Sequence, residues 1–572
     1  MAAGLKGGLV QYGDADFAAY LRRSFAFASG YSRAMLEKPV VGIQSTASGF
    51  NPCHRHFPEL LEAVKRGVLA AGGLPLDFPT ISLGESFASP TTLKFRNLMS
   101  MDTEEMIRAQ PMDAVVLMGG CDKTVPAQLM GAVSADKPAV MLVAGPMLTG
   151  SLDGDRIGAC TDCRRFWGRF RAGEIDRVEI DRVEANLAVT AGTCAVMGTA
   201  STMACLAETL GFALPGSAAI PAVHADRLRA AEASGALAVA IAGLDDRRPS
   251  RLVTAASVDN ALRVLLAIGG STNAVLHLTA IAGRAGVPVT LERLNELSAE
   301  TPVLVDLKPT GGHYMEDFFR GGGLGAVLRE LSPQLDRRTI AVTGETLGER
   351  LRAEADGYVD RAVVRSTADP VDPVGGLAAV FGSLAPSGAI VKRSAADPRL
   401  LEHTGRAVVF SSLADLAQRI DDDDLDVNAD DVLVLQHAGP LSEAAMPEAG
   451  YLPIPKKLAR RGVKDMLRIS DARMSGTAYG AIVLHVAPDA ASGGPLALVR
   501  TGDHVRLSVS GGRLDLLVDD AELDRRRAML PALAKAPDRG YSKLYAEQVT
   551  QAHAGCDFRF LQPPASSGRQ PD

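Results

Sequence analysis

The sequence predicts an α/β protein, with an N-terminal doubly wound α/β domain and a smaller, β-barrel-like C-terminal domain. Up to about residue 365, short apolar runs alternate with stretches of helical periodicity, as in folds that alternate strands and helices. Further along, short β-rich runs recur between Gly, Pro and Asp turns, which favours a small barrel. Residues 365–376, with two prolines and paired glycines, form a linker between the two patterns. We therefore expect domains at 1–370 and 371–562.

Size and composition are those of a soluble globular protein, with 572 residues, 47% hydrophobic and 22% charged. The net charge is -7 with both signs interspersed and 5% aromatic residues, so we expect no nucleic-acid partner. The apolar run at 138–148 is far shorter than the roughly 20 residues that span a bilayer, and the first residues lack a signal-peptide core. We expect a cytoplasmic protein without a membrane partner, and a disordered tail at 563–572.

Three consecutive residues after a predicted strand combine unusual chemistries: Cys121, Asp122 and Lys123. The apolar run at 114–118, closed by two glycines, predicts a buried parallel strand, and a threonine and a proline soon afterwards predict a helix start. Ligands of open α/β sheets gather at this carboxyl edge. A soft thiolate beside a hard carboxylate and a lysine indicates a site for two kinds of metal. The plainer interpretation is a small buried cysteine beside a solvated ion pair.

Seven cysteines without a signal peptide indicate reduced thiols or metal ligands, because an odd number does not form a disulfide framework. Cys53, Cys121 and Cys194 each precede a predicted helix, whose dipole favours the thiolate. Three thiolates on separate loops could hold an iron-sulfur cluster and leave one iron open as a Lewis acid. Cys160 and Cys163 have the C-x-x-C spacing of a redox pair or half a zinc site. No second pair accompanies them, so we interpret them as a structural or supporting feature of open role.

Other segments carry weaker signals. Residues 269–274 and 469–480 are rich in glycine and hydroxyls, but each could be an ordinary glycine-rich turn. Glu85 and Glu448 are isolated glutamates, and such residues are most often solvated surface groups. His54 and its neighbouring histidine invite a metal interpretation, although a polar loop near the site is simpler. The Gly-Gly-Cys-Asp-Lys-Thr run lacks the spacing of a phosphate loop, which excludes nucleotide binding there.

Taken together in chain order, these segments resemble the dihydroxy-acid dehydratase and 6-phosphogluconate dehydratase superfamily across nearly the whole chain. The stretch around Glu85 and residues 90–106 are most similar to the sugar-acid branch, whose members dehydrate pentonates and hexonates such as arabinonate or xylonate. The matching segments are Asn51-Pro52-Cys53, Gly119-Gly120-Cys121-Asp122-Lys123-Thr124, Gly192-Thr193-Cys194, Gly269-Gly270-Ser271-Thr272-Asn273, Met446-Pro447-Glu448 and Ser470-Asp471-Ala472-Arg473-Met474-Ser475-Gly476.

The resemblance implies two bound inorganic groups. One is an iron-sulfur cluster, [2Fe-2S] in this branch with [4Fe-4S] as the alternative, held by Cys53, Cys121 and Cys194. The other is Mg2+, held by Glu85, Asp122, Glu448 and a carboxylated Lys123. An ammonium group cannot ligate a cation, whereas a carbamate offers the hard oxygens that Mg2+ prefers.

The resemblance also implies a catalytic base at Ser475, and we assign Thr477 to substrate binding. The expected enzyme is a hydro-lyase that converts an aldonate, such as L-arabinonate or D-xylonate, to its 2-keto-3-deoxy acid, in a homodimer or homotetramer. The alternative is a dihydroxy-acid dehydratase of branched-chain amino-acid biosynthesis. Residues 439–445 depart from the pattern, because related enzymes usually carry more glycine and proline before Met-Pro-Glu. This departure affects the assignment of Glu448 as a ligand and indicates a changed substrate pocket.

Two other classes of protein fit part of the pattern. An iron-sulfur electron carrier or redox sensor would use the cysteines but has no use for Glu85, Asp122, Lys123 and Ser475. A metal-free sugar-acid binding protein would use neither the cysteines nor the carboxylates, and iron and sulfide analysis would reveal it. The dehydratase interpretation accounts for both sets of residues.

Overall fold

The N-terminal part of the chain is built on a four-stranded parallel sheet. The computed structural model describes residues 2–532 and 535–563. Its first sheet has the order β2-β1-β3-β4 and is made of β1 (Val40–Ser45), β2 (Leu74–Pro79), β3 (Ala114–Gly119) and β4 (Ala139–Val143). β3 and β4 are buried along their whole length, as expected of parallel strands covered on both faces.

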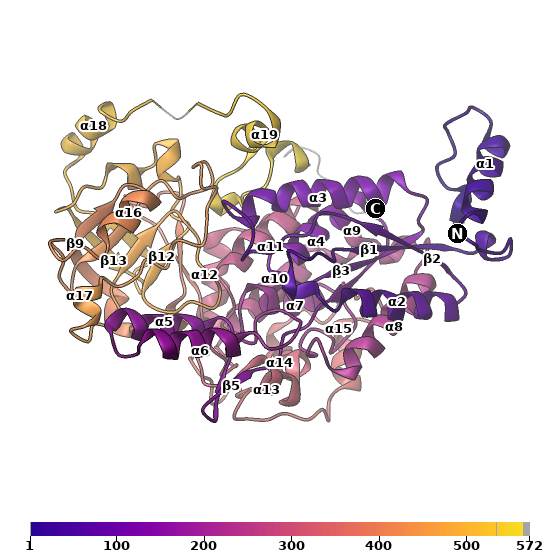
Figure 1. Ribbon diagram of the computed structural model, residues 1–572, viewed down its shortest axis with the longest axis horizontal. Helices are drawn as coiled ribbons and strands as arrows, with labels where there is room; N and C mark the ends of the chain where they lie inside the picture. The colour runs from indigo at the N-terminus through magenta and orange to yellow at the C-terminus, as the bar shows by residue number, and fades with distance from the viewer. Residues whose placement is uncertain (1, 533–534, 564–572) are drawn as a thin grey trace.

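Helices cover both faces of this sheet (Figure 1): α3 and α4 lie on one side, and α2 and α8 on the other. α2 and α8 approach closely through Gly67 and Gly235, where an added Cβ would lie 1.9 Å and 2.2 Å from backbone oxygens of the opposite helix. The doubly wound prediction is confirmed. The helices are α1 (Ala15–Phe27), α2 (Phe57–Ala70), α3 (Thr92–Ala109), α4 (Thr124–Ala135), α5 (Thr161–Ala172), α6 (Arg177–Leu187), α7 (Thr199–Thr209), α8 (Ala225–Ala240), α9 (Pro249–Leu252), α10 (Ala255–Ala267), α11 (Asn273–Arg284), α12 (Leu291–Glu300), α13 (Met315–Arg320), α14 (Gly323–Leu331) and α15 (Leu347–Ala353), with a hairpin of β5 (Gly150–Leu152) and β6 (Asp155–Ile157).

The C-terminal part is built on an eight-stranded sheet in the order β14-β13-β9-β10-β11-β12-β8-β7. A bridge between Phe381, which follows β7, and Arg513 of β14 joins the two edges, so the sheet is nearly closed and the barrel-like prediction is confirmed. A separate apolar core fills it. Its elements are β7 (Ala378–Val380), β8 (Ala389–Val391), β9 (Glu402–Phe410), α16 (Leu413–Arg419), β10 (Val432–Leu435), α17 (Lys456–Ala459), β11 (Arg468–Ser470), β12 (Ile482–Leu484), β13 (His504–Ser508), β14 (Arg513–Leu516), α18 (Asp520–Ala528) and α19 (Gly540–Gln548).

The end of the chain returns to the N-terminal part, where α19 lies beside α3 (Figure 1). There Arg284 Nε donates to Asp557 Oδ2 at 2.6 Å, and both side chains are fully buried. The domain division at residue 370 stays a prediction, and the predicted disordered tail lies, from residue 564 onward, outside the described residues. Between residues 2 and 563, with 533–534 excepted, no helix has the length and apolarity to cross a membrane.

Replacing Asp557 with Ala should destabilise the protein, because the guanidinium of Arg284 would lose its main counter-charge in a buried position. Breaking such a pair from one side costs about 3–5 kcal/mol. The measurement is the urea midpoint of unfolding, with the exposed Asp424→Ala as the matched control. Equal midpoints for the two variants would contradict the assigned role of the pair.

Candidate active site

The carboxyl ends of three neighbouring parallel strands carry most of the predicted site residues of the N-terminal part, and Cys194 lies on the loop between α6 and α7. Cys53 follows β1, Glu85 follows β2, and Cys121 to Lys123 follow β3. The chain runs outward from β1 to β2 and then returns to β3, so the strand order reverses between β1 and β3. Ligands of open α/β sheets bind at such a reversal. The predicted strand and helix around the Cys-Asp-Lys triplet are confirmed as β3 and α4.

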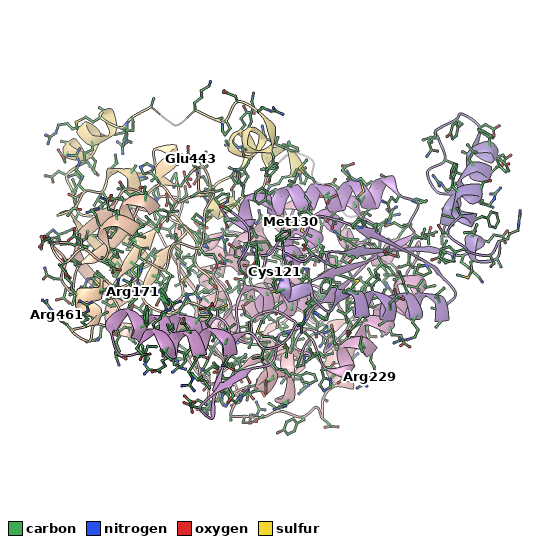
Figure 2. All side chains as sticks on the ribbon, viewed as in Figure 1. Cys121, Met130, Arg171, Arg229, Glu443 and Arg461 are labelled. Atoms are coloured by element: carbon green, nitrogen blue, oxygen red, sulfur yellow. The ribbon has the colours of Figure 1, made fainter. Side chains whose placement is uncertain are left out.

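The C-terminal part contributes residues from a second pair of parallel strands. β10 and β11 pair in parallel; Glu448 follows β10, while Arg473 and Ser475 follow β11. The loops at these strand ends meet the loops of the first sheet, and Figure 2 shows Cys121 in the middle of the molecule where the two parts join. The site is therefore assembled from two sheets.

Three carboxylates converge at this junction. One oxygen each from Glu85, Asp122 and Glu448 can be chosen so that all lie within 4.8 Å of one another. The ammonium of Lys123 lies 2.5 Å from Asp122 Oδ2 and 3.6 Å from Glu85 Oε2, and its side chain is fully buried. All four residues predicted to bind magnesium thus lie in one group.

Arg473 joins the carboxylates of the two parts. Its guanidinium donates to Glu85 Oε1 at 2.7 Å and to Glu448 Oε1 at 2.6 Å, and it is fully buried. Burial would raise the pKa of Glu85, but the charges of Arg473 and Lys123 outweigh it and lower that pKa to about 2. At Glu448 burial prevails and raises the pKa. Sequence reasoning did not single out Arg473, although it lies inside the segment flagged at 469–480.

The donor set fits a hard divalent cation. Carboxylate oxygens are what Mg2+ prefers, and three of them converge here. Lys123 as an ammonium supplies only positive charge; carboxylation would turn it into an additional oxygen donor. Thr91 and Thr92, which sequence reasoning missed, donate their hydroxyl protons to Glu85 and fix its orientation.

The divergent segment before Glu448 does not move that residue away from the group. Ala445 and Met446 have left-handed backbone angles, with φ of 51° and 60°, which side chains adopt at a cost. Met446 O accepts from Arg473 Nε at 2.9 Å, and Met446 N donates to Gly439 O at 3.0 Å. The hydrogen bonds from Arg473 and within the turn therefore stabilise a left-handed backbone conformation that glycine adopts at lower cost.

The cysteines form a second group beside the carboxylates. The adjacent thiol of Cys53, together with burial, raises the pKa of Cys121 well above its usual value. The pKa of Cys194 is also raised, first by Cys160, then by burial and by Cys53 and Cys121. The three predicted cluster cysteines are therefore neighbours, and one of them, Cys194, packs against an apolar cluster that includes Met147. Four thiols in one place fit the sulfur donors of an iron-sulfur cluster.

His54 supports the cysteine group through the backbone. Its Nε2 accepts the N–H of Cys121 at 2.9 Å, which requires that nitrogen to be unprotonated. Burial lowers the pKa of His54 to about 4, and the ring stacks on Phe57. His56 Nε2 contacts the carbonyl of Ala144 at 3.0 Å. These contacts match the simpler interpretation of a polar loop near the site.

Ser475 and Thr477 lie on the loop after β11, with their hydroxyl oxygens 2.8 Å apart. Arg164 of α5 donates to Thr477 Oγ1 at 2.8 Å. The glycine-rich turn at 269–274 packs beneath this loop, where a Cβ on Gly476 would lie 2.7 Å from Ser271. Both flagged glycine-rich segments thus meet at the candidate site.

The chain matches two protein-family models and is similar to known enzymes over most of its length. The models described as dihydroxy-acid/6-phosphogluconate dehydratase N-terminal and C-terminal match residues 38–350 and 362–556. A 6-deoxy-6-sulfo-D-gluconate dehydratase of Pseudomonas putida is 47% identical over 92% of this chain and 91% of its own. An L-arabonate dehydratase of Azospirillum brasilense is 48% identical over 92% and 91%. A dihydroxy-acid dehydratase of Syntrophobacter fumaroxidans is 38% identical over 94% and 97%.

Magnesium should stabilise the folded chain, and Glu85→Gln should remove most of that effect. A ligand at about 100 times its Kd adds roughly 2.7 kcal/mol to the free energy of unfolding. The measurement is the thermal midpoint with and without Mg2+, and the exposed Glu443→Gln is the matched control (Figure 2). An undiminished magnesium effect in Glu85→Gln would argue against a metal at this group.

Proposed function

The chain belongs to the dihydroxy-acid/6-phosphogluconate dehydratase family and is a hydro-lyase, and we propose that it converts an aldonate to its 2-keto-3-deoxy acid. The observation that carries this proposal is the meeting of a carboxylate group and a thiol group at Asp122 and Cys121. The choice of an aldonate is supported by the relatives at 47% and 48% identity, which are named for sugar acids, against 38% for the dihydroxy-acid dehydratase.

The two groups are suited to one substrate because they share a turn of the chain. Glu85, Asp122, Glu448 and a carboxylated Lys123 would hold Mg2+, and Cys53, Cys121 and Cys194 would hold the cluster, [2Fe-2S] in preference to [4Fe-4S]. When bound, these groups would supply positive charge beside the substrate carboxylate and a Lewis acid for the departing C3 hydroxyl. Cys121 and Asp122 are consecutive, so their two donor atoms stay close, with Cys121 Sγ 3.6 Å from Asp122 Oδ1.

Ser475 is the proposed base that removes the C2 proton. Arg164 can only donate, so Thr477 Oγ1 accepts from it and keeps its own proton for Ser475 Oγ, 2.8 Å away. A hydrogen bond to the alkoxide form makes the serine easier to deprotonate. Thr477 is thereby a support for the base as well as a proposed substrate contact. Loss of the C2 proton and the C3 hydroxyl, together one water, leaves an enol that becomes the 2-keto acid.

The remaining features of the proposal are a small-molecule substrate without nucleic-acid or membrane partners, a cytoplasmic location, and a homodimer or homotetramer.

A kinetic panel tests the substrate class. Anaerobically prepared holoenzyme is given pentonates, hexonates, a 6-sulfo hexonate and 2,3-dihydroxyisovalerate, and the 2-keto product is measured directly. Higher kcat/KM on 2,3-dihydroxyisovalerate than on every aldonate would establish the alternative, a dihydroxy-acid dehydratase of branched-chain amino-acid biosynthesis.

Replacing Ser475 with Ala should lower kcat by about 100-fold to 10,000-fold, the usual contribution of a positioned base. Iron, sulfide and magnesium contents should stay at the wild-type level, because the serine is not among the proposed ligands. Ser510→Ala, at the exposed turn after β13, is the control and should keep full activity. Wild-type turnover by Ser475→Ala would remove the serine from the mechanism.

A further inference from the structure

A fourth cysteine lies within the thiol group. Cys160 Sγ is 3.6 Å from Cys194 Sγ, and both cysteines pack against the same apolar residues, Met147 and Ala195 among them. None of the segments that carry the family resemblance includes Cys160. Its place in the group comes from the tertiary structure.

The two sulfurs lie at hydrogen-bonding distance, and their separation excludes a disulfide and fits shared ligation of a metal. A disulfide would bring them to about 2.05 Å, far closer than observed. Two thiolates on one tetrahedral metal, with metal–sulfur bonds of about 2.3 Å, lie roughly 3.8 Å apart. The observed 3.6 Å therefore matches two ligands of one metal.

The four cysteines divide into two pairs. Cys160 Sγ lies 3.6 Å from Cys194 Sγ, and the thiol of Cys53 lies beside that of Cys121. Two pairs of thiolates are the full ligand set of a two-iron cluster. Cys163, the other cysteine of the C-x-x-C sequence, lies in the first turn of α5 and is also a side-chain neighbour of Cys160.

Cys160 is also connected to the loop of the proposed base. It is the N-cap residue of α5, and the next residue, Thr161, donates its hydroxyl to Thr477 O at 3.0 Å. The far end of α5 is fixed to the C-terminal part by Arg171, whose guanidinium lies 2.5 Å from Asp421 Oδ1 (Figure 2). A displacement of Cys160 would therefore also displace the loop that carries Ser475.

We infer that Cys160 is a fourth thiolate ligand of the cluster in the substrate-free enzyme, at the iron that the other three cysteines leave open. This inference rests on the proposed function. The Cys160 thiolate must leave that iron before a substrate hydroxyl can take its place, an exchange that breaks one iron–sulfur bond and changes no oxidation state. Until then the fourth thiolate shields the iron from solvent oxidants.

The test compares wild type, Cys160→Ser and Cys163→Ser, each purified anaerobically as holoenzyme without substrate. Iron and sulfide contents, visible circular dichroism and the electron paramagnetic resonance of the reduced cluster are measured. Cys160→Ser should keep its iron but shift both spectra, because oxygen would replace sulfur at one iron. Cys163→Ser should match wild type. Wild-type spectra from Cys160→Ser at equal iron content would overturn the inference.

A second measurement decides the matter if Cys160→Ser loses iron. Mössbauer spectra of 57Fe-loaded wild type should show only sulfur-coordinated iron before substrate is added, and one site should change when an aldonate is added. A wild-type iron with oxygen or nitrogen ligation in the absence of substrate would overturn the inference. So would a Cys160–Cys163 disulfide found by mass spectrometry in the same anaerobic protein.

The inference and the proposed function fail separately. Absence of a 2-keto acid from iron-loaded wild type on every acid in the panel rejects the function, whatever the spectra show. Unchanged spectra in Cys160→Ser reject only the fourth ligand, and the dehydration proposal then stands with three cysteines.

Discussion

The site depends on one electrostatic constraint: three carboxylates share a small volume and need positive charge between them. Glu85 and Glu448 are 363 positions apart in the chain and belong to different sheets, yet one guanidinium donates to both. A buried arginine with two carboxylate partners is strongly held, because removing either side leaves charge uncompensated. Arg473 therefore fixes how the two parts of the chain meet. The other residues of the site take their positions from that junction.

The same junction explains why the carboxylates and the thiols lie side by side. Parallel strands present their carboxyl ends at one edge, so β1, β2 and β3 deliver Cys53, Glu85 and the Cys-Asp-Lys turn to one place. β10 and β11 do the same from the other sheet. Soft sulfur donors and hard oxygen donors usually serve different metals. Their adjacency through Cys121 and Asp122 is the observation on which the proposed two-metal dehydration rests.

Support around the site is concentrated on groups that orient rather than react. His54 accepts the N–H of Cys121, and its depressed pKa, caused mainly by burial, keeps the ring neutral in that role. Thr91 and Thr92 orient Glu85, and Arg164 reaches the Ser475 loop from α5. Such contacts hold reacting groups in place before substrate arrives, which is where much of catalytic preorganisation resides. Ala445 and Met446 have left-handed backbone angles, which cost conformational energy in residues that carry a side chain. The surrounding contacts hold the backbone in this conformation.

The sequence by itself determined the elements and the chemistry available to them. Apolar patterning predicted β3 and the change from a doubly wound part to a barrel-like part, because burial sets which positions must be apolar. A threonine and a proline predicted the start of α4. Motif resemblance indicated the cysteines, the carboxylates and Ser475. Only the tertiary structure decided that Arg473 joins Glu85 to Glu448, that Thr91 and Thr92 orient Glu85, and that Cys160 lies beside Cys194. These contacts join residues on different elements, and local patterning carries no information about which chain segments will meet.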